Sequence, residues 1–242
     1  MDPQQKAVAE EFDRYQTTYK TAVNDALSFS GLDVDFFTRV KAEYLVDLVR
    51  DGFGTTEGLK VLDIGCGIGN YHSLLTGRFA ELSGVDVSAA CIDIARENHP
   101  EVAYLAYDGT RLPYEDGSFD VVFTICVIHH VPVPQWQGFV SEMARVLRPG
   151  GMALVFEHNP RNPLTMRVVN RCPFDKDAVL LNAGEATALF TTPAFSSVHT
   201  RHILSIPPWN AALRRVDSVL GYLPLGAQYY LQARRAGDPA AG

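Results

Sequence analysis

Short apolar runs alternate with longer amphipathic stretches between residues 59 and 156. Apolar runs of this length, bounded by glycine or polar residues, are typical of strands buried on both faces of a parallel sheet. Strands are predicted over residues 59–64, 82–87, 102–106, 119–127 and 152–156. Helices are predicted between them over about 70–80, 88–98 and 134–147. Ser88 and Pro134 favour helix starts there, and His99-Pro100 and Pro149-Gly150-Gly151 favour helix ends. The alternation predicts βαβ units, and therefore a parallel α/β sheet with helices on both faces.

The flanking segments are less regular. A helix is predicted over 183–192, and two strands over 195–206 and 227–235 are expected to pair antiparallel at the sheet edge. Residues 8–50 carry apolar and aromatic positions at spacings of three and four, which predicts two or three helices. We interpret residues 1–50 as an N-terminal helical lid on residues 51–242, the two forming one structural unit.

Composition narrows the class of protein. The chain has 242 residues, 47% of them hydrophobic and 20% charged, which excludes general disorder. Its net charge is −7 and no Lys/Arg run exceeds a pair, so a nucleic-acid partner is not expected. The four cysteines form no CxxC pair, which favours buried, reduced thiols. The polar N-terminus and the lack of a run of about 20 apolar residues predict a soluble, cytoplasmic protein with no membrane partner.

A glycine-rich turn follows the first predicted strand. Residues 63–69 have the form D-x-G-x-G-x-G, which differs from the dinucleotide G-x-G-x-x-G and lacks the G-K-[ST] of a P-loop. The carboxylate of Asp63 would repel a pyrophosphate and suits an ammonium group. Asp86 ends the second strand, where an acid can accept both hydroxyls of a ribose. The site therefore predicts a ribonucleoside with a cationic, amino-acid-like head, which describes S-adenosylmethionine.

Four motifs occur in order along the chain. They are the glycine turn from Val61 to Gly69, the segment Gly84–Ser88, Asp108–Leu112 with Phe119–Val122, and Leu147–Gly151. In these the sequence resembles the class I S-adenosylmethionine-dependent methyltransferases of the small-molecule type, often labelled type 11. The resemblance implies a Rossmann-like α/β fold with a seven-stranded, mostly parallel sheet, the last strand antiparallel, for residues 51–242.

The resemblance also assigns cofactor contacts for S-adenosylmethionine. Residues of the glycine turn would line its methionine part, namely Asp63, Gly65, Cys66, Gly67 and Gly69. Asp86 would hold the ribose, with Val87 and Leu112 on either side of the adenine. Asp108 would accept from the adenine amino group, with Gly109 and Thr110 near the ring; a turn role for Asp108 stays open. Cys126 would offer its backbone carbonyl to the methionine ammonium.

Catalytic candidates follow the fourth and fifth strands. Methyl transfer is an in-line displacement on an activated reagent, so the protein mainly aligns and shields, and a base is needed only for a protonated nucleophile. His129 and His130 follow strand four, and Glu157 and His158 follow strand five. Loop histidines bonded to backbone, and a polar turn before Pro160, are the alternatives.

Substrate contacts are expected from three segments. The candidates are Tyr15 and Tyr19 on the lid, Asn159 after strand five, and Arg167 and Arg171 one helical turn apart. Aromatic core packing and a solvated helix face are the alternatives, and Trp136 and Trp209 are weaker candidates for a pocket wall. No metal is expected, because the acids are scattered and no histidine cluster has ligand spacing.

The sequence thus favours a methyltransferase acting on O or N, less so C, of a small metabolite in secondary metabolism, as a monomer or homodimer. An enzyme of the same fold running a cyclisation or rearrangement on a natural product stays open. A non-catalytic subunit is disfavoured because the glycines are intact. A nucleic-acid methyltransferase is disfavoured by charge and by the absence of an Asn/Asp-Pro-Pro-aromatic motif after strand four.

Overall fold

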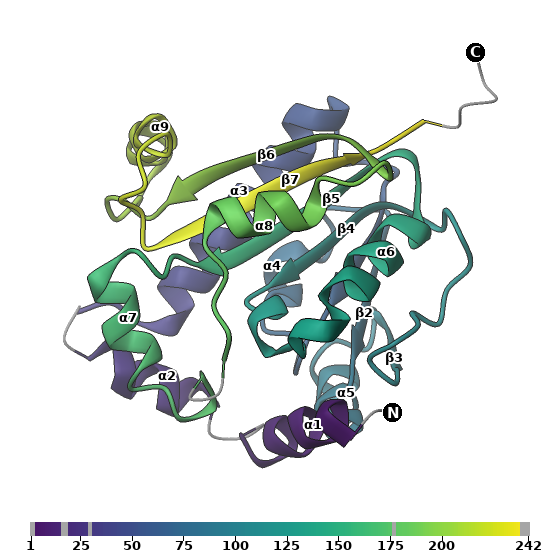
Figure 1. Ribbon diagram of the computed structural model, residues 1–242, viewed down its shortest axis with the longest axis horizontal. Helices are drawn as coiled ribbons and strands as arrows, with labels where there is room; N and C mark the ends of the chain where they lie inside the picture. The colour runs from purple at the N-terminus through teal and green to yellow at the C-terminus, as the bar shows by residue number, and fades with distance from the viewer. Residues whose placement is uncertain (1–2, 16–18, 29–30, 176–177, 238–242) are drawn as a thin grey trace.

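A computed structural model describes residues 3–15, 19–28, 31–175 and 178–237. Its centre is a seven-stranded sheet in the order β3-β2-β1-β4-β5-β7-β6 (Figure 1). All strands run parallel except β7, which pairs antiparallel with both β5 and β6. The predicted fold class is therefore confirmed. The strands are β1 Lys60–Ile64, β2 Glu81–Asp86, β3 Ala103–Ala106, β4 Phe119–Ile125, β5 Leu147–His158, β6 Phe195–Ile203 and β7 Gln228–Arg235.

The apolar runs form strands because both faces of the sheet are covered. Side chains alternate along β4, so that Val121 and Phe123 enter one core cluster while Val122 enters the other. The cluster around Val122 packs under α6 and α8, and the cluster around Val121 and Phe123 packs under α3 and α4. The helices are α1 Pro3–Tyr15, α2 Tyr19–Leu27, α3 Val34–Phe53, α4 His72–Leu75, α5 Ala89–Asn98, α6 Trp136–Val146, α7 Pro163–Val169, α8 Ala183–Phe190 and α9 Ala211–Leu220.

Two predicted elements differ from the structure. The helix expected over 70–80 is the single turn α4, because Thr76 leaves the helical region and Gly77 follows at φ +76°. Strand β5 begins at Leu147 instead of residue 152. It pairs with Phe119 before a register shift, which places the Pro149-Gly150-Gly151 segment inside an irregular strand.

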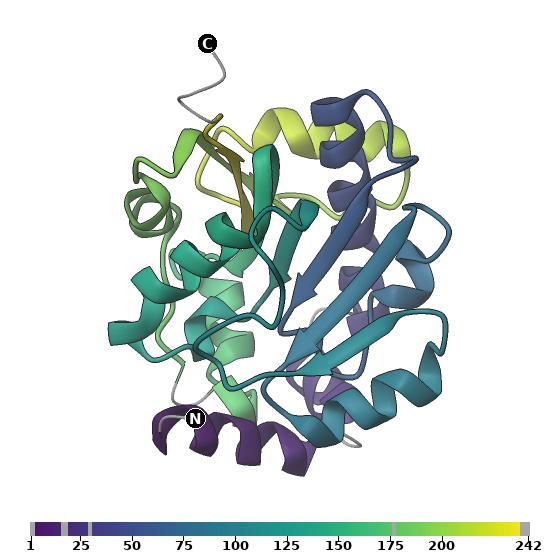
Figure 2. The same cartoon turned by 90° about the vertical axis from the view of Figure 1, so that its right-hand side faces the viewer.

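The N-terminal helices, which were predicted to form a lid, divide between the core and the cavity end of the sheet. Helix α3 belongs to the core cluster around Val121 and Phe123 and packs against β5. The division at residue 50 therefore falls inside a helix of the sheet's covering layer. Helix α1 packs against α5 and η3 (Pro173–Asp175), and α2 packs against α7. Figure 2 shows α1 lying across the end of the sheet toward which the parallel strands point. In the part of the chain described, no helix has the length and apolar character to cross a membrane.

Candidate active site

A cavity of about 630 Å³ opens at the carboxyl ends of the parallel strands. Its size lies within the range of small-molecule sites, and ligands of open α/β sheets bind at this edge. The glycine turn, the turn after β4, the end of β5, η3 and the first three helices all contribute to its wall. Predicted site residues on the wall are Asp63, Gly65, Cys66, Gly67, Asp86, Val87, Cys126, His129, His130 and His158.

The glycine turn is held close to β2 by its backbone. Gly65 has φ +77°, and its N–H donates to Val85 O at 2.8 Å. A Cβ added at Gly65 would lie 2.5 Å from the Val127 side chain. The turn therefore needs glycine at 65 both for its left-handed backbone and for the approach of the turn after β4. Gly69 packs against Tyr104 and His99 away from the cavity wall, so its expected role in holding the cofactor stays a prediction.

Asp63 is 3% exposed at the end of β1 and is oriented by a buried chain of hydrogen bonds. His72 Nε2 lies 3.1 Å from Asp63 Oδ2, and His72 Nδ1 bonds the Tyr104 hydroxyl. Burial raises the pKa of Asp63, while the His72 bond acts to lower it. Sequence reasoning did not find His72 and Tyr104, because no spacing rule links residues on different elements.

Asp86 is buried beside the glycine turn. Its Oδ2 accepts from Gly67 N at 2.8 Å and its Oδ1 from Ser88 N at 2.9 Å. Burial raises the pKa of Asp86 to about 6 although these hydrogen bonds act in the opposite direction. The carboxylate thus joins the first and second strand ends at the cavity wall. Tyr107, just after β3, lines the cavity nearby and was missing from the sequence-based candidates.

In the segment after β3, the side chain of Asp108 bonds to the residues that follow it. Asp108 is exposed, and its Oδ1 accepts from Thr110 N, the Thr110 hydroxyl and Arg111 N. The Thr110 hydrogen bonds and that from Arg111 lower the pKa of Asp108 to about 2. Gln5 of α1 lies against Gly109 and its Nε2 is 3.4 Å from Gly109 O. Asp108, Gly109 and Thr110 do not line the cavity in the described structure, and their contacts to adenine stay predictions.

Cys126 occupies a strained position at the end of β4. It has φ +58°, which non-glycine residues rarely adopt, and its N–H donates to Phe156 O. Its Sγ lies 3.6 Å from Nζ of Lys41, a buried lysine of α3. Burial opposes ionisation of the thiol, but Lys41 and His158 outweigh it and lower the pKa of Cys126 to about 7. Sequence reasoning missed Lys41, which lies among apolar residues of a predicted helix without a motif.

Glu157 lies behind the cavity wall and organises the turn after β4. It is 2% exposed, and its Oε1 accepts from Val127 N at 3.2 Å and Ile128 N at 2.8 Å. Its Oε2 lies 2.5 Å from His129 Nδ1. Glu157 therefore fixes the ring of His129 and is not among the cavity-lining residues. Glu157 was a catalytic candidate, and in the structure it has the position of a residue that supports the cavity wall.

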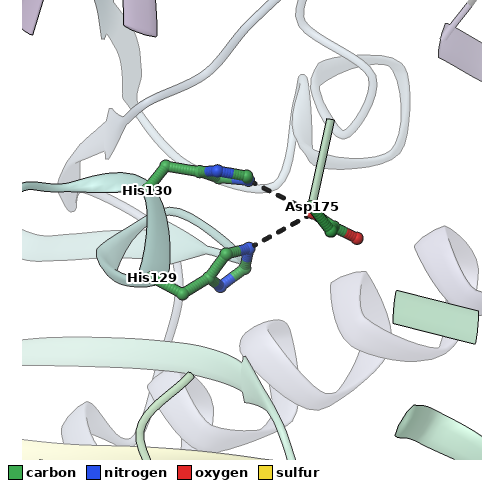
Figure 3. Close-up of side chains that lie close together, drawn as sticks. All are labelled: His129, His130 and Asp175. Carbon is green, nitrogen blue, oxygen red and sulfur yellow. Dashed lines mark ion pairs between the residues drawn. The ribbon is translucent and has the colours of Figure 1, made fainter. Parts of the chain in front are cut away.

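The two histidines after β4 point toward Asp175 (Figure 3). His129 Nε2 lies 3.7 Å and His130 Nε2 lies 3.4 Å from Asp175 Oδ1. Phe12 of α1 packs edge-on against the His130 ring at 5.0 Å between centroids. Asp175 lies in a segment that the sequence left without assigned chemistry, and no local pattern marks it as a partner of residues after β4.

The other candidates whose side chains the structure describes lie outside the cavity wall. Asn159 is fully buried and donates to Pro224 O and Gly226 O, so it holds the loop before β7. Arg167 and Arg171 are exposed and do not line the cavity. Tyr15 ends α1 and Tyr19 begins α2, and their side chains fall outside the described part of the chain. The remaining aromatic candidates do not line the cavity: Trp136 donates to Ile128 O and Val131 O, and Trp209 is 67% exposed.

Comparison of the sequence with known proteins finds methyltransferases. Residues 62–155 match the methyltransferase domain family. An uncharacterized methyltransferase of Synechocystis sp. is 35% identical over 116 residues, covering 48% of this chain and 55% of the relative. A phthiotriol/phenolphthiotriol dimycocerosates methyltransferase of Mycobacterium ulcerans is 36% identical over 111 residues, covering 44% of this chain and 40% of the relative. The chain thus spans about half the length, or less, of these curated relatives.

A solved structure extends the likeness to nearly the whole fold. A methyltransferase from Thermotoga maritima, described as a possible histamine N-methyltransferase, superposes with a TM-score of 0.67 at 20% identity. The superposition covers 93% of this chain and 98% of that one. The sheet order, the glycine turn and the family match define a class I methyltransferase fold. Residues 62–155 therefore resemble the methyltransferase domain family, and the chain as a whole has the fold of that solved methyltransferase.

Proposed function

We propose that the protein transfers a methyl group from S-adenosylmethionine to an oxygen or nitrogen of a small, partly apolar molecule. The observation that carries this is one continuous cavity, which connects the buried Asp63 and Asp86 on one side to a histidine cluster on the other. Its remaining wall includes apolar side chains of the first three helices, among them Val8, Phe12 and Phe36. Such a lining favours an acceptor with apolar surface.

The residues on the first side fit the cofactor. Asp86 offers carboxylate oxygens where the two hydroxyls of a ribose can donate, and Asp63 offers negative charge for the cationic methionine end. Lys41, also on the wall, supplies a cation that suits the methionine carboxylate. When bound, the cofactor supplies an electrophilic methyl group on a sulfonium sulfur. The protein's own residues hold the two reactants in line and exclude water.

The second side carries groups that can take a proton. His130 and His158 both reach the cavity wall. Burial and the neighbouring His129 lower the pKa of His130, so its imidazole is neutral near pH 7 and can accept a proton from a hydroxyl or ammonium acceptor. Glu157 positions His129 and does not reach the cavity itself.

Calorimetric titration of S-adenosylmethionine tests the cofactor assignment. Asp86→Asn is expected to weaken binding about 10- to 100-fold, the range for losing a hydrogen bond to a charged group. Asp93→Asn is the matched control, because Asp93 is exposed on α5 and paired with Arg96. Absence of binding to the unaltered chain at millimolar cofactor would contradict the proposal. Asp108→Asn separates the two interpretations of that residue, since an adenine contact predicts a loss and a turn role predicts none.

Mass spectrometry of turnover tests the reaction. The chain is incubated with the cofactor and a panel of partly apolar alcohols, phenols and amines, and the products are examined for a gain of one methylene. Demethylated cofactor and methylated product should appear in equal amounts. A rearranged or cyclised product of unchanged mass, with the cofactor intact, would favour the second interpretation of the fold.

A further inference from the structure

We propose that His129, His130 and Asp175 form a binding site for a divalent transition-metal ion of the zinc type. Their ligand atoms all lie within 4.8 Å of one another, and Figure 3 shows both rings directed at the carboxylate. Two ligands of a tetrahedral zinc ion lie about 3.3 Å apart, given zinc–ligand bonds of about 2.0–2.1 Å. The observed separations of 3.4 and 3.7 Å from Asp175 Oδ1 approach that spacing.

His129 already has the surroundings of a metal ligand. Its Nδ1 faces the Glu157 carboxylate at 2.5 Å, an arrangement that fixes the ring and directs Nε2 away from Glu157. Metal-bound histidines usually donate their second ring nitrogen to a carboxylate or carbonyl in this way. His129 Nε2 is buried and has no hydrogen-bond partner among the described residues. A buried polar atom without a partner is costly, and an ion would satisfy it.

The carboxylate is held in place by the backbone around it. Asp175 N donates to Cys172 O, and Ala178 N donates to Asp175 O. Val179 N in turn donates to His129 O at 3.0 Å, which ties this segment to the turn after β4. A backbone hydrogen bond therefore holds the segment of Asp175 beside His129, in addition to the side-chain contacts of Asp175 with both histidines.

Charge and donor type select the ion. Glu157 and Asp175 are both buried carboxylates, so the cluster holds two negative charges that need nearby compensation. A divalent cation supplies it and leaves both imidazoles neutral. Two imidazoles and one carboxylate suit zinc, iron or nickel, whereas magnesium and calcium prefer oxygen ligands.

The site lies on the acceptor side of the cavity. All three ligands line the wall, so a group from the cavity can complete the coordination. This part of the inference rests on the proposed methyl transfer: an acceptor hydroxyl bound to the ion would lose its proton more readily, with His158 as the remaining histidine to take it. Metal binding itself is independent of the reaction and is tested separately.

The test uses the untagged full chain after treatment with a chelator. Titration with Co²⁺, followed by its visible absorption, and displacement by Zn²⁺ measure stoichiometry and affinity. One ion per chain is expected, undisturbed by excess Mg²⁺. Asp175→Asn and His130→Gln should each weaken zinc binding more than tenfold, and Glu157→Gln should weaken it by about 10- to 100-fold as a supporting carboxylate.

Two further variants make the result decisive. His199→Gln removes an exposed histidine of β6 and should leave binding unchanged. Cys126→Ser should also leave it unchanged, and the cobalt spectrum should lack a thiolate charge-transfer band. The proposal is overturned if the unaltered chain does not bind zinc. It is also overturned if Asp175→Asn and His130→Gln bind zinc as tightly as the unaltered chain. Loss of binding only in Cys126→Ser would place the ion at Cys126 and also overturns it. If the cofactor titration fails while zinc still binds, the metal site stands and the methyl-transfer proposal does not.

Discussion

The two sides of the cavity are built from different kinds of groups. On the cofactor side, the end of β1, the glycine turn and the end of β2 meet within residues 63–87. Backbone N–H groups orient the carboxylate of Asp86 there. On the acceptor side, the facing groups come from α1, the turn after β4, the end of β5 and η3. Phe12, His130 and Asp175 meet there although they are far apart in the sequence.

The difference indicates which side of the cavity can change its residues and its chemistry. A site made from a backbone turn and two acids requires particular residues at particular spacings, because the turn geometry sets them. A site made from side chains on separate segments requires only that the segments meet. The acceptor side can therefore change its chemistry without disturbing the sheet, as the many functions of shared folds illustrate.

The largest effect is expected where the two sides touch. Gly65→Ala should destabilise the fold by about 2–5 kcal/mol, because a left-handed Ala costs about 1–2 kcal/mol and overpacking about 1–3 kcal/mol. The overpacking comes from Val127, 2.5 Å from the added Cβ. Urea unfolding measures the change. Gly67→Ala is the matched control, since Gly67 also has positive φ but its Cβ would meet nothing within 4 Å.

The double variant with Val127→Ala sharpens this comparison. If overpacking carries part of the cost, Val127→Ala should be less damaging when combined with Gly65→Ala than in the unaltered chain. Equal losses of stability for Gly65→Ala and Gly67→Ala, with no coupling to position 127, would show that Val127 does not restrict the space at residue 65.

A smaller effect is expected on the cofactor side as pH changes. The pKa of Asp86 is raised to about 6 by burial, so its ionised fraction falls to roughly a tenth at pH 5. Ribose hydroxyls donate to the ionised carboxylate, so binding favours the deprotonated form and affinity should fall as pH drops. Cofactor affinity at pH 5 should be about tenfold weaker than at pH 8 by calorimetry. In Asp86→Asn this drop should be absent, and a drop of equal size there would assign it to another group.

The smallest effect is expected in the reactivity of Cys126. Its pKa of about 7 predicts that iodoacetamide modification rises through neutral pH, ahead of Cys91, whose pKa burial raises to about 11. Lys41→Met removes the cation beside the thiol and should slow modification at pH 7 several-fold. Peptide mass mapping reports each site separately. Similar rates for Cys126 and Cys91, or no response to Lys41→Met, would contradict the thiolate assignment.

Sequence patterns predicted the sheet well because burial of both faces leaves continuous apolar runs. The antiparallel pairing of β6 with β7 was also correctly predicted. The prediction of a helix over 70–80 was wrong, because α4 ends at Leu75, where Thr76 leaves the helical region and Gly77 follows with positive φ. The start of β5 was missed, because Pro149 and glycine residues usually end pairing and here lie beside a register shift.

The candidate site could be predicted only where the chemistry is local. Asp63 and Asp86 each stand at a strand end within a short local motif, and the structure places both on the cavity wall. Lys41 and Asp175 carry no local signal, because their roles depend on tertiary contacts with Cys126 and the His129 turn. Asn159 illustrates the opposite case: a polar residue at a strand end that satisfies a buried loop instead of facing the cavity.

Helix α1 contacts both sides of the cavity at once. Asp13 accepts a hydrogen bond from Ser88 beside Asp86, and Phe12 packs on His130. In kinetic terms, this helix couples the two sides, because a displacement of α1 would loosen the contact beside Asp86 and the contact on His130 together. Motion of α1 would therefore change both sides in one step, and conformational steps of this kind limit the turnover of many enzymes.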